Sequence, residues 1–319
     1  MSRFLLKRTG RMVLVLFAIS VLVFCIFNVI PNSDPAARIA GKSATPELIA
    51  QVERTWGFDD PLPEQYLTMM KLIFTGDLVS YERQFNVDEE IWKGLPATLS
   101  LCVGAAVIWL FFGVLMGYLA AFRAGRLTDR VLMLISLVSI SLPIFFVSAL
   151  ALSYLSFDLE IFPSGGYVGL TEDPLDWAYH LILPWTTLAI LLIGIYARVL
   201  RANLLETMDE DFVRTARAKG LRERQVRIRH VLRNALLPIV TLLGLDFAAL
   251  FGGAAIVTEF IFSLQGIGQL AADAVIELDL PPIMAVTLFA AFFVVVLNTL
   301  VDIAYTWLDP RIKLQRSAR

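Results

Sequence analysis

Six apolar runs, each long enough to cross a lipid bilayer as a helix, constrain this sequence more than any other feature. The hydrocarbon core of a bilayer is about 30 Å thick, so a helix needs about 20 residues to cross it. The runs cover residues 12–30, 97–122, 131–157, 180–200, 235–262 and 284–308. Only 18% of the residues are charged, whereas soluble domains average about 25%. The sequence therefore predicts an all-α membrane protein with six transmembrane helices.

Two of these runs contain a proline. Pro143 lies in the third run and Pro184 in the fourth. A proline removes a backbone donor and kinks a helix, which membrane helices tolerate where neighbouring groups satisfy the freed carbonyl. We therefore expect a kinked helix at each position.

The distribution of basic residues predicts the orientation in the membrane. Of the 27 Lys and Arg residues, 21 lie in the N-terminal tail, in the loop after the second run, in the segment from Arg198 to Arg233, and in the C-terminal tail. Basic segments stay on the cytoplasmic side, so we expect both termini in the cytoplasm. The first apolar run is longer than the stretch of about 7–15 residues in a signal peptide, and we expect it to be a retained anchor.

This topology divides the chain into four parts. Residues 1–30 form a cytoplasmic tail and the first span, and residues 31–96 form an extracytoplasmic subdomain. Residues 97–308 form a core of five spans with a cytoplasmic loop at 201–234, and residues 309–319 form a second cytoplasmic tail.

The extracytoplasmic subdomain carries two helix signals. Thr45 is a favourable N-cap, and Pro46 follows it at the first helical position. A second short helix is expected over residues 63–74, before Gly76, which can take the left-handed conformation that commonly follows a helix.

The longest strongly charged segment covers residues 207–238, between the fourth and fifth runs. Thr207 and Glu210 have the spacing of a capping box, which predicts the start of a helix. Gly220 is expected to end that helix. A second, basic helix is expected from Leu221 towards the fifth span.

The first of these two helices has a face suited to docking. Phe212, Ala216 and Lys219 fall on one side of it, with Val213 and Arg217 beside them. Small residues permit close approach, and burial of Phe212 would contribute about 2 kcal/mol. The alternative interpretation is a solvated basic loop that sets the topology and touches anionic lipid.

Four polar side chains lie in or near the apolar runs: Asp246, Glu259, Asn298 and Asp302. A carboxylate at the centre of a span costs about 2.5–3.5 kcal/mol on insertion scales, so such groups normally face the bundle or a cavity. Asp246 is expected near the middle of the bilayer, as either a group that lines a solute pathway or a protonated or hydrogen-bonded structural group. Asn298 is a second candidate for the pathway, whereas Glu259 and Asp302 are expected to bond neighbouring helices.

No metal site and no disulfide are predicted. Cys25 and Cys102 both lie in apolar runs, where cysteine is usually a small buried hydrophobe. Neither His180 nor His230 has a partner at a spacing typical of metal ligands.

Two stretches of the charged segment resemble a known family. DFVRTARAKGL at 211–221 and RHVLRNALLP at 229–238 are similar to the EAA loop, the cytoplasmic coupling loop in the inner-membrane permeases of ABC importers. The resemblance is to the dipeptide, oligopeptide and nickel branch of this family. Arg214 and Thr215 stand where the glutamate and first alanine of the motif would be, and Gly220 matches its glycine.

Further motifs extend this resemblance over almost the whole chain. They lie at 57–66, 76–78, 95–99, 141–143, 258–270 and 308–312. Their order and spacing together are specific. The large first outer loop makes the chain resemble the first of the two permeases that such systems usually encode.

The resemblance implies the fold of a type I ABC importer permease in a bacterial inner membrane. The implied partners are a second permease, expected to be a paralogue, two cytoplasmic ATPase subunits and an extracytoplasmic substrate-binding protein. ATP would be bound by the ATPase subunits, so the chain is expected to be no enzyme and to carry no cofactor. The expected solute is a peptide; relatives also carry glutathione and nickel complexes.

The resemblance also assigns the energy input to the helix at 207–220. The implied ATPase-coupling residues are Asp211, Phe212, Val213, Thr215, Ala216, Arg217, Lys219 and Gly220. The alternative is a secondary transporter or channel that works without an ATPase. Such a protein is expected to show an inverted repeat, paired broken helices and intramembrane charge relays, whereas this sequence shows no such repeat and only Asp246 deep in a span.

Overall fold

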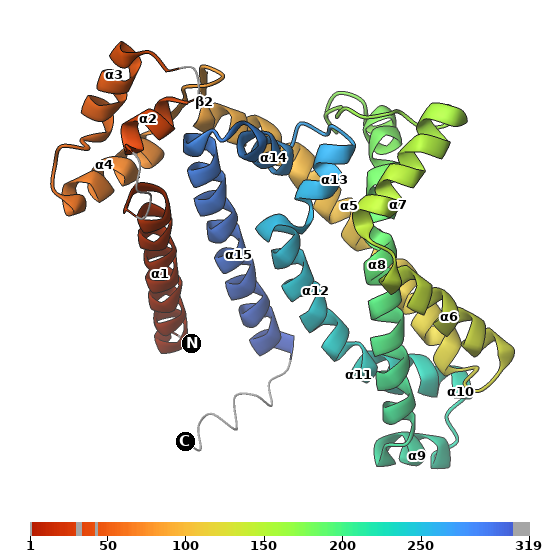
Figure 1. Ribbon diagram of the computed structural model, residues 1–319. Coiled ribbons are helices and arrows are strands. Elements are labelled where there is room, and N and C mark those ends of the chain that lie inside the picture. The colour runs from red at the N-terminus through yellow and green to blue at the C-terminus, as the bar shows by residue number, and fades with distance from the viewer. Residues whose placement is uncertain (1, 30–33, 42–43, 309–319) are drawn as a thin grey trace. The chain divides into compact units, whose positions relative to one another are not determined.

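The computed structural model describes residues 2–29, 34–41 and 44–308, with side chains for 8–29, 34–41 and 44–301. The chain divides into two compact units. Unit 1 comprises Met1–Leu99 and Ala248–Arg319, and unit 2 comprises Ser100–Phe247. Both units are mainly helical (Figure 1).

Unit 1 consists of helices and one small hairpin. Its elements are α1 (Ser2–Phe24), η1 (Cys25–Val29), α2 (Pro35–Ala40), α3 (Pro46–Trp56), α4 (Leu62–Thr75), β1 (Val79–Ser80), β2 (Phe85–Asn86), η4 (Leu250–Ala254), α13 (Ile256–Ile261), α14 (Ile267–Glu277) and α15 (Leu280–Leu308). The two strands pair antiparallel, with Val79 opposite Asn86. Elements named η are short π-helical segments.

Unit 2 shares two helices with unit 1, namely α5 (Val87–Ala121) and α12 (Leu237–Ala249). Its other elements are α6 (Leu127–Ser141), α7 (Ile144–Ala151), η2 (Leu152–Asp158), α8 (Pro174–Met208), α9 (Asp211–Ala218), α10 (Glu223–Gln225), η3 (Val226–Leu232) and α11 (Arg233–Ala235).

The helices confirm the predicted fold class. Among the described residues, five helices are long and apolar enough to cross a membrane: Arg8–Val29, Val87–Ala121, Pro174–Met208, Leu237–Ala254 and Leu280–Val301. A bent pair, Leu127–Ser141 with Ile144–Asp158, makes a sixth if it counts as one span.

The third predicted run is broken into two helices and is not only kinked. Its two helices meet at 97°. Leu142 has an extended backbone (φ −87°, ψ 126°), and Pro143 is the N-cap of α7. A proline disfavours the helical conformation of the residue before it, and this explains the break. Pro184, in contrast, lies inside the uninterrupted helix α8, as expected.

The helix signals predicted within residues 45–76 are confirmed. Thr45 Oγ1 accepts a hydrogen bond from the Leu48 N–H at 3.3 Å, at the start of α3. Gly76 ends α4 in the left-handed conformation with φ +74°. Val52 and Trp56 of α3 are buried in the core of unit 1. The short helix α2 and the β1–β2 hairpin were not predicted.

Glycines bring α5 close to α8 in unit 2. A Cβ atom at Gly113 would lie 2.7 Å from the Tyr196 Cβ, and one at Gly117 would lie 2.8 Å from the Ala197 carbonyl oxygen. These two glycines form a GxxxG pair, which permits close contact between membrane helices. Helix α8 also contacts α6. There the Ser136 hydroxyl of α6 donates a hydrogen bond to the Gly194 carbonyl of α8 at 2.6 Å.

We expect Gly117→Ala to destabilise the protein by about 1–3 kcal/mol, because the added methyl group meets backbone that cannot move aside cheaply. The matched control is Gly10→Ala, since a Cβ at Gly10 in α1 meets no atom within 4 Å. The measurement is the melting temperature of the purified chain in detergent. Equal melting temperatures for the two variants would contradict the close packing of α5 on α8.

Candidate coupling helix and polar groups of the spans

Helix α9 begins and ends close to where the sequence suggests, but its cap is different. Thr207 lies in the last turn of α8, and its hydroxyl donates to the Asn203 carbonyl at 2.7 Å. Glu210 occupies the N-cap position without a side-chain hydrogen bond. The predicted capping box is therefore wrong, because Thr207 bonds back along its own helix. The glycine stop is confirmed, since Gly220 has φ +77°.

One face of α9 holds it to the rest of the chain. Val213 is fully buried and Ala216 is 6% exposed. This face packs against η3, where Val226 and Val231 are also fully buried. Two of the eight predicted coupling residues therefore contact the chain itself, and the contact of the set with an ATPase stays a prediction.

The opposite face of α9 is open. Phe212 is 42% exposed, and the other exposed members of the predicted set are Asp211, Thr215, Arg217, Lys219 and Gly220. The Arg217 Nε lies 2.9 Å from the Glu223 Oε1, so an ion pair joins α9 to α10 across the Gly220 turn. Exposed ion pairs contribute about 0–1 kcal/mol. The open face offers an aromatic ring and cationic groups to a docking partner.

Asp246 is bound to a neighbouring helix of unit 2. The Tyr196 hydroxyl of α8 donates to the Asp246 Oδ2 at 2.8 Å. Asp246 is half-buried and Tyr196 is fully buried. The sequence identified Asp246 but not its partner, because a tyrosine inside an apolar run reads as an ordinary aromatic residue. Asn298, the other pathway candidate, is half-buried on α15 of unit 1.

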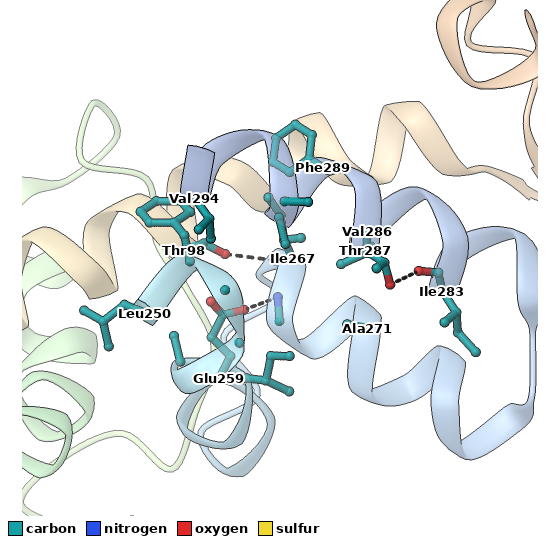
Figure 2. Close-up of a pocket in the computed structure, with 18 of the residues that line it drawn as sticks. Thr98, Leu250, Glu259, Ile267, Ala271, Ile283, Val286, Thr287, Phe289 and Val294 are labelled. Atoms are coloured by element: carbon teal, nitrogen blue, oxygen red, sulfur yellow. Dashed lines mark hydrogen bonds between the residues drawn. The ribbon is translucent and has the colours of Figure 1, made fainter. Parts of the chain in front are cut away.

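Glu259 organises the turn between α13 and α14 in unit 1, as Figure 2 shows. Its Oε2 accepts hydrogen bonds from the backbone N–H groups of Gly268, at 2.8 Å, and Gln269, at 3.2 Å. The Thr98 hydroxyl oxygen accepts a third, from the Ile267 N–H at 2.9 Å. The N-terminal turn of α14 is thus satisfied by two buried side chains. The expected helix-bonding role of Glu259 is confirmed, and the role of Thr98 had no signal in the sequence.

A cavity of about 480 Å³ adjoins this turn. Its lining is mostly apolar and comes from η4, α13, α14 and α15 of unit 1 (Figure 2). The Glu259 Oε1 is buried, and among the described residues it has no hydrogen-bond partner. Gly266 leaves room for this carboxylate, because a Cβ there would collide with the Glu259 Oε2. The side chain of Asp302 lies outside those that the structure describes.

Within the described residues, no group of three or more His, Cys, Asp or Glu side chains could hold a metal ion. Among the described residues, neither Cys25 nor Cys102 forms a disulfide.

Among its described residues the chain combines candidate membrane spans with a short helix, exposed on one face, in its charged segment, which places it among helical membrane proteins. Comparison with known families makes this specific. The family described as the binding-protein-dependent transport system inner membrane component matches residues 113–314, and its N-terminal family matches residues 1–102. The chain belongs to the inner membrane components of binding-protein-dependent transport systems, and it is a multi-pass ABC transporter permease subunit rather than an enzyme.

Relatives align over nearly the whole chain. A putative peptide transport system permease of Brucella abortus is 38% identical over 98% of this chain and 99% of its own length. The dipeptide transport system permease DppB of Bacillus subtilis is 32% identical over 99% of both chains. The di/tripeptide transport system permease DppB of Pseudomonas aeruginosa is 34% identical over 99% of this chain and 100% of its own. The family resemblance drawn from the sequence motifs is confirmed.

We expect Glu259→Ala to destabilise the protein by about 1–3 kcal/mol, because it leaves buried backbone N–H groups of α14 without an acceptor. The variant Glu259→Gln keeps an acceptor oxygen and is expected to lose less. Melting temperatures of the two variants in detergent test this. A Gln variant as unstable as the Ala variant would show that the accepted hydrogen bonds are not what the carboxylate contributes.

Proposed function

We propose that this chain forms one half of the translocation pathway of an ATP-driven importer for peptides, and that α9 receives the energy from a separate ATPase. The observation that carries the coupling role is the exposed face of α9, on a helix whose other face is buried against η3. The peptide solute is supported by the names of the relatives, which describe peptide, dipeptide and di/tripeptide systems.

The proposed assembly contains four kinds of subunit. Membership of a binding-protein-dependent ABC family implies an ATPase and a binding protein. We further propose two ATPase subunits, a paralogous second permease and an extracytoplasmic binding protein that delivers the solute. Both termini and residues 201–234 would lie in the cytoplasm, where the ATPases bind the ATP.

The packing of α9 indicates which of its residues would contact the ATPase. Phe212, Thr215 and Lys219 would contact the ATPase, whereas Val213 and Ala216 would transmit its movement to η3. Tightly packed side chains transmit displacement with little loss. Because η3 leads through α11 into the candidate span of α12, closure of the ATPases would move a membrane helix as a rigid body.

Asp246 and Asn298 are proposed to line the pathway. An intramembrane carboxylate normally faces a bundle interior or a cavity, and Asp246 is half-buried rather than enclosed. Its bond from Tyr196 fixes the orientation of one oxygen. The other oxygen would then be available to a protonated amine of the solute.

We expect Phe212→Asp to insert and fold normally but to lose import, because Phe212 is exposed in the free chain and its burial on docking would contribute about 2 kcal/mol, or about thirtyfold in affinity. The measurement is peptide uptake by vesicles that contain the complete transporter, together with copurification of the ATPase. The control is Phe74→Asp on α4, where the ring is 81% exposed. Uptake at the normal rate by Phe212→Asp would show that α9 does not dock through this face.

We expect Asp246→Asn to slow peptide uptake without changing the melting temperature, since asparagine keeps an acceptor for Tyr196 and removes only the charge. The companion variant Tyr196→Phe keeps the charge and removes the hydrogen bond. Its uptake is expected to fall less than that of Asp246→Asn. Normal uptake by Asp246→Asn would assign this aspartate a purely structural role.

A further inference from the structure

A second hollow, with a volume of about 310 Å³, lies in unit 2 beside the coupling helix. Its walls come from the end of α5 and the loop after it, the end of α8, and the segment from α9 to η3. Four arginines line it: Arg123, Arg126, Arg217 and Arg227. Glu223 is the one acidic residue among the described residues of its lining. The hollow is therefore strongly cationic.

Glu223 neutralises only part of this charge. Its Oε1 lies 2.9 Å from the Arg217 Nε, and its Oε2 lies 3.5 Å from the Arg227 Nε. Both oxygens are thus occupied by the arginines of the coupling segment. Arg123 and Arg126 have no carboxylate within ion-pair distance in the part of the chain that the structure describes. Two exposed guanidinium groups remain for a bound anion.

The hollow also has an apolar wall. Phe122, Leu205 and Met208 contribute to it. The Arg227 guanidinium carbon lies 4.9 Å from the centre of the Phe122 ring, so a cation–π contact holds this arginine in place. Directly after Arg126, Leu127 is 76% exposed at the start of a candidate span. An apolar surface therefore continues from the arginines along a membrane helix.

We propose that this hollow binds the phosphate of an anionic phospholipid headgroup. Guanidinium groups match phosphate oxygens in bidentate geometry. The hollow lies where the candidate span Val87–Ala121 ends, which is the level at which headgroups lie. The exposed apolar residues after Arg126 favour a lipid over a free phosphate ion, since they offer a surface to the acyl chains.

A lipid in this hollow would link two segments that lie far apart in the sequence. Arg123 and Arg126 belong to the loop before α6, whereas Arg217 and Arg227 flank the coupling turn. One phosphate between them would neutralise part of the surplus positive charge and hold the coupling segment against the membrane end of α5. Lipid binding at this place would be a property beyond the proposed import of peptides.

The test is native mass spectrometry of the full chain from nanodiscs that contain equal amounts of phosphatidylglycerol and phosphatidylcholine. The wild-type chain is expected to retain phosphatidylglycerol preferentially. The double variant Arg123→Gln, Arg126→Gln is expected to retain it about tenfold less well, because basic groups near the surface each favour anionic lipid. The matched control is Arg222→Gln, Arg224→Gln, which removes the same charge from exposed positions of the coupling segment that lie outside the hollow.

The two double variants are first compared by melting temperature, so that misfolding is not mistaken for loss of the lipid. Equal loss of phosphatidylglycerol in both would overturn the proposal, because it would reflect overall charge. A second arm supplies inorganic phosphate to the chain in phosphatidylcholine alone. Retention of phosphate there, without any preference for phosphatidylglycerol, would overturn the lipid assignment. The proposal would also be overturned if the Arg123→Gln, Arg126→Gln variant kept its preference for phosphatidylglycerol but lost the ATPase from the complete transporter. The hollow would then be a contact with another protein.

Discussion

Inside the hydrocarbon region every backbone N–H and C=O group must find its partner within the protein, and this constraint governs where the helices of this chain can end. Two breaks in the described membrane helices have identifiable causes. Pro143 imposes an extended backbone on Leu142, and Gly253 interrupts the fifth apolar run with φ +131°. Where α14 begins in a buried place, Glu259 and Thr98 accept its N–H groups. Buried side chains here replace the water that satisfies helix ends in soluble proteins.

Helix α9 is stabilised in a different way from α14. Its N-terminus has no side-chain cap, and its eight residues are too few for a stable helix in water, where isolated helices shorter than about 12–15 residues are marginal. Burial of Val213 and Ala216 against η3 is what keeps it helical. Packing, rather than capping, therefore defines the helix that faces the proposed partner.

Signals that depend on a few neighbouring residues could be read from the sequence. The Thr45 cap, the glycine stops at Gly76 and Gly220, and the apolar runs are of this kind. Choices between competing local bonds could not: Thr207 bonds back to Asn203 instead of capping α9. Contacts between distant segments were also hidden, so the Tyr196 partner of Asp246 and the burial of Val213 emerged only from the packed structure.

Gly220 and Gly117 differ in what an added side chain would meet. At Gly220 an added Cβ meets no atom within 4 Å, and only the positive φ restricts the choice of residue. Asparagine adopts that backbone more readily than most residues, so a change to asparagine at Gly220 would disturb no neighbouring atom of this chain. At Gly117 the backbone of α8 itself occupies the space, and a change requires compensating substitutions on another helix. Among homologues, we therefore expect substitutions at Gly220 to occur without other changes in the chain, and substitutions at Gly117 to occur together with changes on α8.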